Sequence, residues 1–149
     1  VQESIRPALE RGDLVMADRY VSSTLAYQGT AGGLPIDEIL SVARVACHGA
    51  WPDLVVVFDV DEKTASRRRN GGPRGKGGAA KGPGLFEDRM EQKKTEFHRK
   101  VREGFLAQVS GDPATYALVD ARKDEDRVFE ALVEMVRSRL DAMALKEKG

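Results

Sequence analysis

Polar side chains of the types used in binding and catalysis are concentrated in one short stretch of the sequence, directly after a run of apolar residues. A carboxylate and a guanidinium come first, as Asp18 and Arg19. The hydroxyl, phenol and amide groups that follow belong to Tyr20, Ser22, Ser23, Thr24, Tyr27 and Gln28. A single Asp at a strand end is usually structural, because it terminates the strand and caps the next helix. A loop that only turned the chain would not need this whole set, so the stretch is a candidate binding or catalytic site.

The chemistry open to these groups is recognition of an anion and of the rings attached to it. The planar fork of Arg19 suits a bidentate grip on a phosphate or a carboxylate. Asp18 can hold Mg²⁺ or a magnesium-bound water, or can pin Arg19 through an ion pair. Thr24, Tyr27 and Gln28 fall within one helical turn, so we expect their polar ends to share a face and to contact a base and a sugar.

A second stretch, from Gly71 to Gly84, has a composition of its own. It holds seven Gly, two Pro, Arg74, Lys76 and Lys81 without any acidic residue, and it closely follows three arginines. Such a stretch cannot bury a core, so a mobile loop is expected. Composition alone favours a solvated surface insertion. A cationic flap that closes over phosphates is the sharper alternative, and an RNA-binding tail is a third, although the aromatic residues used for base stacking are missing.

The elements that must position these groups follow from apolar runs and from helical periodicity. Three apolar runs of strand length, each ending at an Asp, lie at residues 14–17, 54–58 and 116–119. Helical spacing of apolar residues flanks and separates them, at residues 1–9, 36–47, 86–105 and 128–143. Continuous apolar runs are typical of a buried parallel sheet, and the alternation predicts an α/β fold. Ligands bind beyond the carboxyl ends of such strands, where the three Asp residues are expected.

Length, charge and cysteine content exclude several classes of protein. The 149 residues suit one domain, and neither a repeat nor a linker divides them. The 24 basic and 24 acidic residues cancel, which argues against a protein dedicated to coating nucleic acid. Cys47 is the only cysteine, so the chain can form neither an internal disulfide nor a thiolate cluster, and a cytoplasmic location is expected. No apolar run approaches the roughly 20 residues of a membrane-spanning helix, so no membrane partner is expected.

Six spaced motifs, in order and in register over nearly the whole chain, resemble the thymidylate kinase family. They lie at residues 5–13, 18–29, 52–60, 88–91, 97–106 and 119–121. The resemblance implies a P-loop-kinase-like α/β fold with three layers and a parallel sheet, here reduced to about three strands. It also implies a nucleoside monophosphate kinase that transfers the γ-phosphate of ATP to dTMP, with Mg²⁺ as cofactor and a homodimer as the full-length enzyme.

Carried over residue by residue, the resemblance implies two groups of site residues. Arg19 grips the dTMP phosphate and Asp18 supports the metal, while Thr24 approaches the thymine edge. Tyr27 lies at the sugar, where it disfavours a ribose hydroxyl, and Gln28 lines the same pocket. The residues implied on the ATP side are Arg68, Asp120, Ala121 and Arg122. Residues 71–84 correspond to a lid, with Arg74 as its catalytic arginine.

The most serious departure from the family is that the sequence contains no Gly-x-x-x-x-Gly-Lys-Ser/Thr, the loop that cradles the ATP phosphates. The lid is also longer and richer in Gly than is usual in the family, and Lys93 stands where the family usually has an acidic residue. The family keeps that loop upstream of what aligns with Val1. We therefore expect residues 1–149 to be a partial domain, the C-terminal two-thirds, and inactive alone. A non-catalytic kinase-like binding or scaffold module is the alternative, and nucleic-acid binding through residues 67–81 is a third hypothesis. An uncovered apolar sheet edge is expected to make the isolated chain marginally stable and prone to associate.

Overall fold

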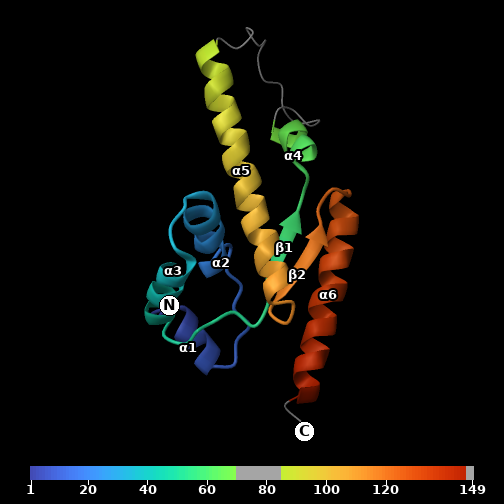
Figure 1. Cartoon of the computed structure of the whole chain (residues 1–149). Helices are drawn as coiled ribbons and strands as arrows, with labels where there is room; N and C mark the ends of the chain where they lie inside the picture. Colours follow the sequence, from blue (N-terminus) through green and yellow to red (C-terminus); the bar gives the residue numbers. More distant parts are fainter. Residues whose placement is uncertain (70–84, 147–149) are drawn as a thin grey trace.

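Helices make up most of the structure, and two strands form its sheet. The computed structural model describes residues 1–69 and 85–146 (Figure 1). In chain order the elements are α1 (Ile5–Glu10), α2 (Val21–Thr24), the π-helix η1 (Leu25–Ala31), α3 (Ile36–Cys47), β1 (Val55–Asp59), α4 (Glu62–Arg69), α5 (Leu85–Gly111), β2 (Tyr116–Asp120) and α6 (Glu125–Lys146). In these two described ranges, no helix is both long enough and apolar enough for a membrane crossing.

The sheet is parallel, as the apolar runs predicted. β1 pairs with β2 in register, from Val55 opposite Tyr116 to Asp59 opposite Asp120. The carboxyl ends of the two strands therefore lie side by side, and each ends in an Asp. The 27-residue α5 contacts both strands, and α6 contacts β2 (Figure 1). The expected α/β fold is confirmed, with two paired strands in the described part of the chain.

The third expected strand, at residues 14–17, is not formed, and that prediction was wrong. These residues belong to no helix or strand. Leu14 and Met16 are 74% and 89% exposed, so the run is not buried as its apolar composition indicated. A strand needs a hydrogen-bonded neighbour, and none of the residues that the structure describes supplies one here. Residues 1–69 and 85–146 therefore contain two paired strands instead of about three.

Close packing joins η1 to α5, where Ala26 faces Gly104. Ala26 is fully buried, and a Cβ atom placed on Gly104 would lie 2.7 Å from the Thr30 Oγ1 atom and 3.1 Å from the Ala26 Cα atom. Because Gly104 has no side chain, the two helices can approach until their backbones nearly touch. Phe97 and Val101 share this face of α5 by helical spacing. The contact fixes η1, the element that carries much of the site.

Candidate functional site

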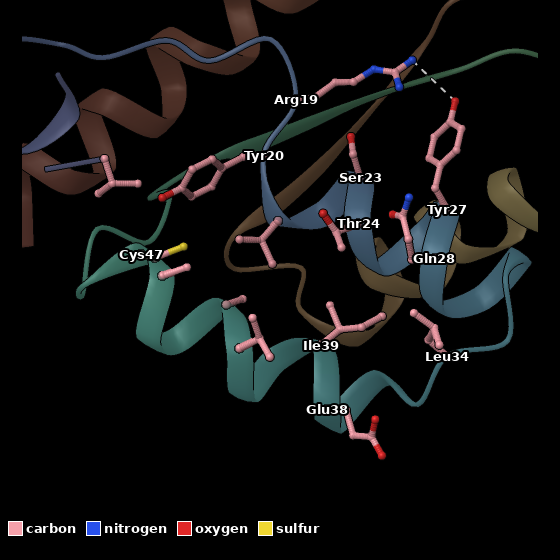
Figure 2. A pocket seen from close by; sticks show the side chains of 15 residues that line it. Arg19, Tyr20, Ser23, Thr24, Tyr27, Gln28, Leu34, Glu38, Ile39 and Cys47 are labelled. Atoms are coloured by element: carbon pink, nitrogen blue, oxygen red, sulfur yellow. Dashed lines mark hydrogen bonds between the residues drawn. The ribbon is translucent and has the colours of Figure 1, made fainter. Parts of the chain in front are cut away.

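A cavity of about 800 Å³ opens beside the polar stretch, between α2 and η1 on one side and α3 on the other (Figure 2). Its polar wall includes Arg19, Ser23, Thr24, Tyr27 and Gln28. Its apolar wall includes Leu34, Ile39, Val42, Ala43 and Cys47. The structure thus brings four of the predicted site residues to one wall, and Asp18 is not among the lining residues. A cation and several polar ends opposite an apolar wall suit an anionic ligand with a flat, weakly polar body.

Arg19 has a left-handed backbone conformation, with φ 71°. This conformation is uncommon for a residue with a Cβ atom, and such strained residues cluster at functional sites. The guanidinium lies over the Tyr27 ring, with its Cζ atom 5.1 Å from the ring centroid, and Nη2 donates to the phenol oxygen at 3.5 Å. Asp18 is exposed, and within the described part of the chain it forms no ion pair with Arg19. Of the two roles predicted for Asp18, pinning Arg19 is therefore not observed.

The π-helical geometry of η1 arranges the remaining side chains of the polar wall. Thr24 ends α2 and η1 continues the same helical segment, so Thr24, Tyr27 and Gln28 follow one another around a single turn. Figure 2 shows all three side chains extending to the same side of this segment. π-Helical segments occur often at functional sites. The shared face predicted from the spacing of these residues is present.

Two aromatic side chains of α5 pack against the Tyr27 ring. Its ring centroid lies 6.1 Å from that of Phe97, with 64° between the ring planes, and 6.4 Å from that of Phe105, with 79°. Edge-to-face pairs of this kind are the favoured arrangement of aromatic rings. The Tyr27 ring is therefore fixed between α5 and the guanidinium of Arg19.

Tyr20 belongs to the same stretch but has a structural role. Its hydroxyl donates to the Ala50 carbonyl at 3.2 Å, which ties the stretch to the turn after α3. Burial, followed by the neighbouring Cys47 thiol, raises the pKa of Tyr20 to about 12. A phenol with so high a pKa remains protonated at neutral pH, so Tyr20 is an anchor and not a proton acceptor.

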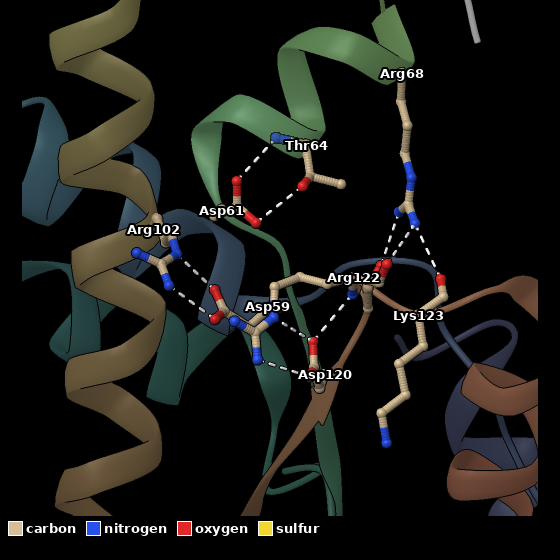
Figure 3. Close-up of polar contacts among 9 residues, drawn as sticks. Asp59, Asp61, Thr64, Arg68, Arg102, Asp120, Arg122 and Lys123 are labelled. Atoms are coloured by element: carbon tan, nitrogen blue, oxygen red, sulfur yellow. Dashed lines mark hydrogen bonds and ion pairs between the residues drawn. The ribbon is translucent and has the colours of Figure 1, made fainter.

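Two arginine–carboxylate pairs lie at the carboxyl ends of β1 and β2 (Figure 3). Arg102 of α5 binds the two carboxylate oxygens of Asp59 at 2.6 and 2.8 Å. Arg122 binds both oxygens of Asp120 at 2.8 Å. Hydrogen bonds from Arg122 hold the pKa of Asp120 well below its usual range, and the bond to Asp59 raises the pKa of Arg102. Both carboxylates bind a guanidinium through their two oxygens, so we assign them the role of positioning these arginines.

Arg68, in the last turn of α4, is bound to the loop that follows β2. Its Nη1 atom donates to the Ala121 carbonyl at 2.8 Å, and Nη2 donates to the carbonyls of Lys123 at 3.1 Å and Arg122 at 3.5 Å (Figure 3). The residues that the resemblance places on ATP are Arg68, Asp120, Ala121 and Arg122, and they lie together at this corner. Most of the hydrogen-bonding groups of these four residues bind other residues of the same cluster.

Sequence reasoning missed what α5 does for both clusters. Its apolar periodicity marked Phe97 and Phe105 as a buried helix face, but it could not indicate that they contact Tyr27. Arg102 lies within one of the six motifs, yet no local signal pairs it with Asp59, 43 residues away. One helix thus supports the polar wall of the cavity and the strand ends.

Part of the predicted site lies outside the described residues. Arg74 and all of residues 71–84, the expected lid, belong to this part. Among the residues that are described, no group of three His, Cys, Asp or Glu side chains is arranged to hold a metal. Asp18, exposed and unpaired with Arg19, has the chemistry of a single oxygen ligand.

Comparison of the sequence with known proteins gives one consistent result. Residues 1–132 match the protein family described as thymidylate kinase. The chain is 39% identical over 147 residues to the thymidylate kinase of Nitratidesulfovibrio vulgaris, an alignment that covers 97% of this chain and 65% of the relative. It is 40% identical over 135 residues to that of Solidesulfovibrio magneticus, covering 89% and 61%. The chain therefore spans somewhat less than two-thirds of the length of these curated relatives.

Comparison of structures agrees with the sequences at the level of fold. The crystal structure of a thymidylate kinase from Ehrlichia chaffeensis superposes with a TM-score of 0.62 at 20% sequence identity, covering 91% of this chain and 55% of that one. The expected P-loop-kinase-like fold is thereby confirmed for the part of it that this chain contains.

Proposed function

The chain belongs to the thymidylate kinase family, and we propose that the whole protein transfers the γ-phosphoryl group of ATP to dTMP, giving ADP and dTDP. The observation that carries this proposal is the polar wall of the cavity. Arg19 lies beside Thr24, Tyr27 and Gln28 there, opposite an apolar wall. A pyrimidine nucleotide has the matching parts, since it combines an anionic phosphate, a sugar and a flat base.

On the acceptor side, each residue of the wall has one task. Arg19 grips the dTMP phosphate with its planar fork, and the Tyr27 ring already holds that guanidinium in place. Thr24 and Gln28 hydrogen-bond the thymine base and its surroundings from the adjoining turn of the helix. Tyr27 borders the sugar, where its ring leaves little room for a ribose hydroxyl.

On the donor side, the loop after β2 and the end of α4 border the adenine of ATP. Arg68, Asp120, Ala121 and Arg122 form this border. The hydrogen bonds of Arg68 to the loop carbonyls and the Asp120–Arg122 pair support the assignment, because they give the loop one defined shape before nucleotide arrives. Preorganised sites of this kind lose less entropy on binding.

Phosphoryl transfer needs positioning and charge neutralisation more than covalent help from the protein. Arg19 neutralises the acceptor phosphate and keeps it in line with the donor, and Arg74 of the lid does the same for the transferred group. Asp18 fits the role of a single Mg²⁺ ligand, direct or through water, because its carboxylate is exposed and makes no ion pair with Arg19. Bound Mg²⁺ neutralises charge on the ATP phosphates.

The test is phosphorylation of dTMP by the protein translated from the whole open reading frame. Arg19→Ala is expected to lower kcat/KM for dTMP by about a hundredfold or more, because one anion-binding group is lost from the transition state. Arg11→Ala is the matched control, since Arg11 pairs with Asp13 on the surface and not with the site. Absence of kinase activity in the whole protein, with dTMP still bound, would instead favour a non-catalytic module. An unchanged rate in Arg19→Ala would overturn the site assignment.

A further inference from the structure

Phe97 lies partly exposed on α5, where nothing in its chemistry suggests contact with a ligand, but it touches the side chain that holds Arg19. We infer that Phe97 is a positioning residue for Arg19 and acts through the Tyr27 ring. The inference rests on the proposed function in one respect, since that function gives Arg19 the task of gripping a phosphate.

Arg19 needs such support because its side chain is long and its backbone position is unusual. With a left-handed backbone, the side chain leaves the chain in a direction that the rest of the polar stretch does not share. Freezing the rotatable bonds of an arginine costs conformational entropy, and a guanidinium held in advance loses less of it on binding. The two contacts with Tyr27, through the ring face and the phenol oxygen, provide this restraint.

Tyr27 can restrain Arg19 only if its own ring is fixed. Phe97 and Phe105 approach it at angles of 64° and 79°, two α5 turns apart. The close contact of Gly104 with Ala26 keeps α5 and η1 at a constant separation, so both aromatic contacts stay in register. The aromatic side chains of α5 therefore fix the Tyr27 ring, and the Tyr27 ring in turn restrains the guanidinium of Arg19.

Of the residues in this series of contacts, Phe97 can be replaced with the least disturbance to the fold. Phe105 adjoins Gly104 in the tight helix contact, so its replacement would disturb the fold as well as Tyr27. Phe97 lies two turns away and is 38% exposed. Phe97→Leu keeps the apolar character but removes the aromatic edge, whereas Phe97→Tyr keeps the edge.

The first measurement observes Arg19 directly in the whole protein without nucleotide. Protons above a ring face shift upfield, so the Arg19 Nε–Hε signal in a ¹H–¹⁵N spectrum is expected upfield of the exposed arginines. Phe97→Leu should move this signal toward the solvent-like position, while Phe97→Tyr should retain the original position. Phe129→Leu, the same change at an exposed position on α6, is the matched control and should leave the signal unmoved. An Arg19 signal unaffected by Phe97→Leu overturns the inference.

The second measurement separates a positioning role from a general structural one. In the whole protein, Phe97→Leu is expected to weaken dTMP binding by about two- to tenfold, the range of one aromatic pair and one cation–π contact. Thymidine, which lacks the phosphate, should lose much less affinity than dTMP, because it keeps only the contact between Tyr27 and the sugar. An equal loss for both ligands overturns the inference, because the effect would not run through Arg19. If the wild type binds no dTMP, the proposed function fails, while the Arg19 signal still decides the positioning role.

Discussion

The guanidinium of Arg68 is occupied by backbone carbonyl groups, and this changes what can be expected of the residue. The resemblance places an arginine here against ATP. In the structure the same group donates to three carbonyls of residues 121–123. A guanidinium with this many acceptors shapes a loop, so its effect on the nucleotide is expected to be indirect.

We predict that Arg68→Lys loosens the loop without unfolding the protein. An ammonium cannot reproduce the planar fork that reaches several carbonyls at once. Amide hydrogen exchange at residues 121–123 should become faster, and KM for ATP in the whole protein should rise by about three- to tenfold, as for the loss of one to two hydrogen bonds. Arg67→Lys is the control, since it makes the same change one residue earlier. Unchanged exchange at residues 121–123 would contradict the role of Arg68 as a loop anchor.

At the scale of elements, the contact between α5 and η1 determines where the polar wall lies. Gly104 allows the contact, because any side chain there would meet Thr30 and the backbone of Ala26. The same helix carries the two aromatic residues behind Tyr27 and the arginine that binds Asp59. A small displacement of α5 would therefore disturb both clusters at once.

Gly104→Ala is predicted to destabilise the protein despite the high helix propensity of alanine. A new Cβ atom would lie 2.7 Å from Thr30 Oγ1, so the helices must separate, at a cost of about 1–3 kcal/mol for overpacking. Denaturant unfolding followed by circular dichroism measures this change. Gly111→Ala at the end of the same helix is the matched control, because a Cβ atom there meets nothing within 4 Å. Equal stability of the two variants would show that the α5–η1 contact is not tight.

The elements were predictable from the sequence to different degrees, for physical reasons. Helices and the two paired strands follow from local periodicity, and α3, β1, β2 and α6 lie close to their predicted ranges. Residues 14–17 carry the same apolar signal as β1, but strand formation depends on a neighbour that no local pattern encodes. The shared face of Thr24 and Tyr27 followed from spacing alone. The carbonyl contacts of Arg68 depend on a loop more than 50 residues away, so no local pattern of residues indicates them.

At the scale of the whole molecule, apolar side chains remain uncovered along one part of the sheet and the segment beside α1. Leu14 and Met16 are largely exposed to solvent, and Phe58 and Leu118 are about half exposed. Large exposed apolar patches on soluble proteins usually mark interaction surfaces or aggregation sites. Burial of each such side chain is worth about 1.5–3 kcal/mol, so contact between copies is favoured.

We predict that the isolated 149-residue chain associates with itself in a concentration-dependent manner. Sedimentation velocity should show an average mass that rises with concentration, and Met16→Gln should reduce the rise. Val45→Thr is the control, because it makes an apolar side chain more polar at another strongly exposed position, on α3, where Val45 is 74% exposed.

Unfolding of the same samples tests the prediction independently. Association stabilises the folded state by mass action, so the unfolding midpoint should rise with protein concentration. Met16→Gln should flatten this dependence, because it removes apolar area from the contact and leaves the buried α5–η1 packing intact. A sharp, reversible transition of a monomer over about a hundredfold range of concentration would contradict the prediction. In that case the exposed apolar side chains would be tolerated by the isolated fold, and their exposure would carry no penalty in solution.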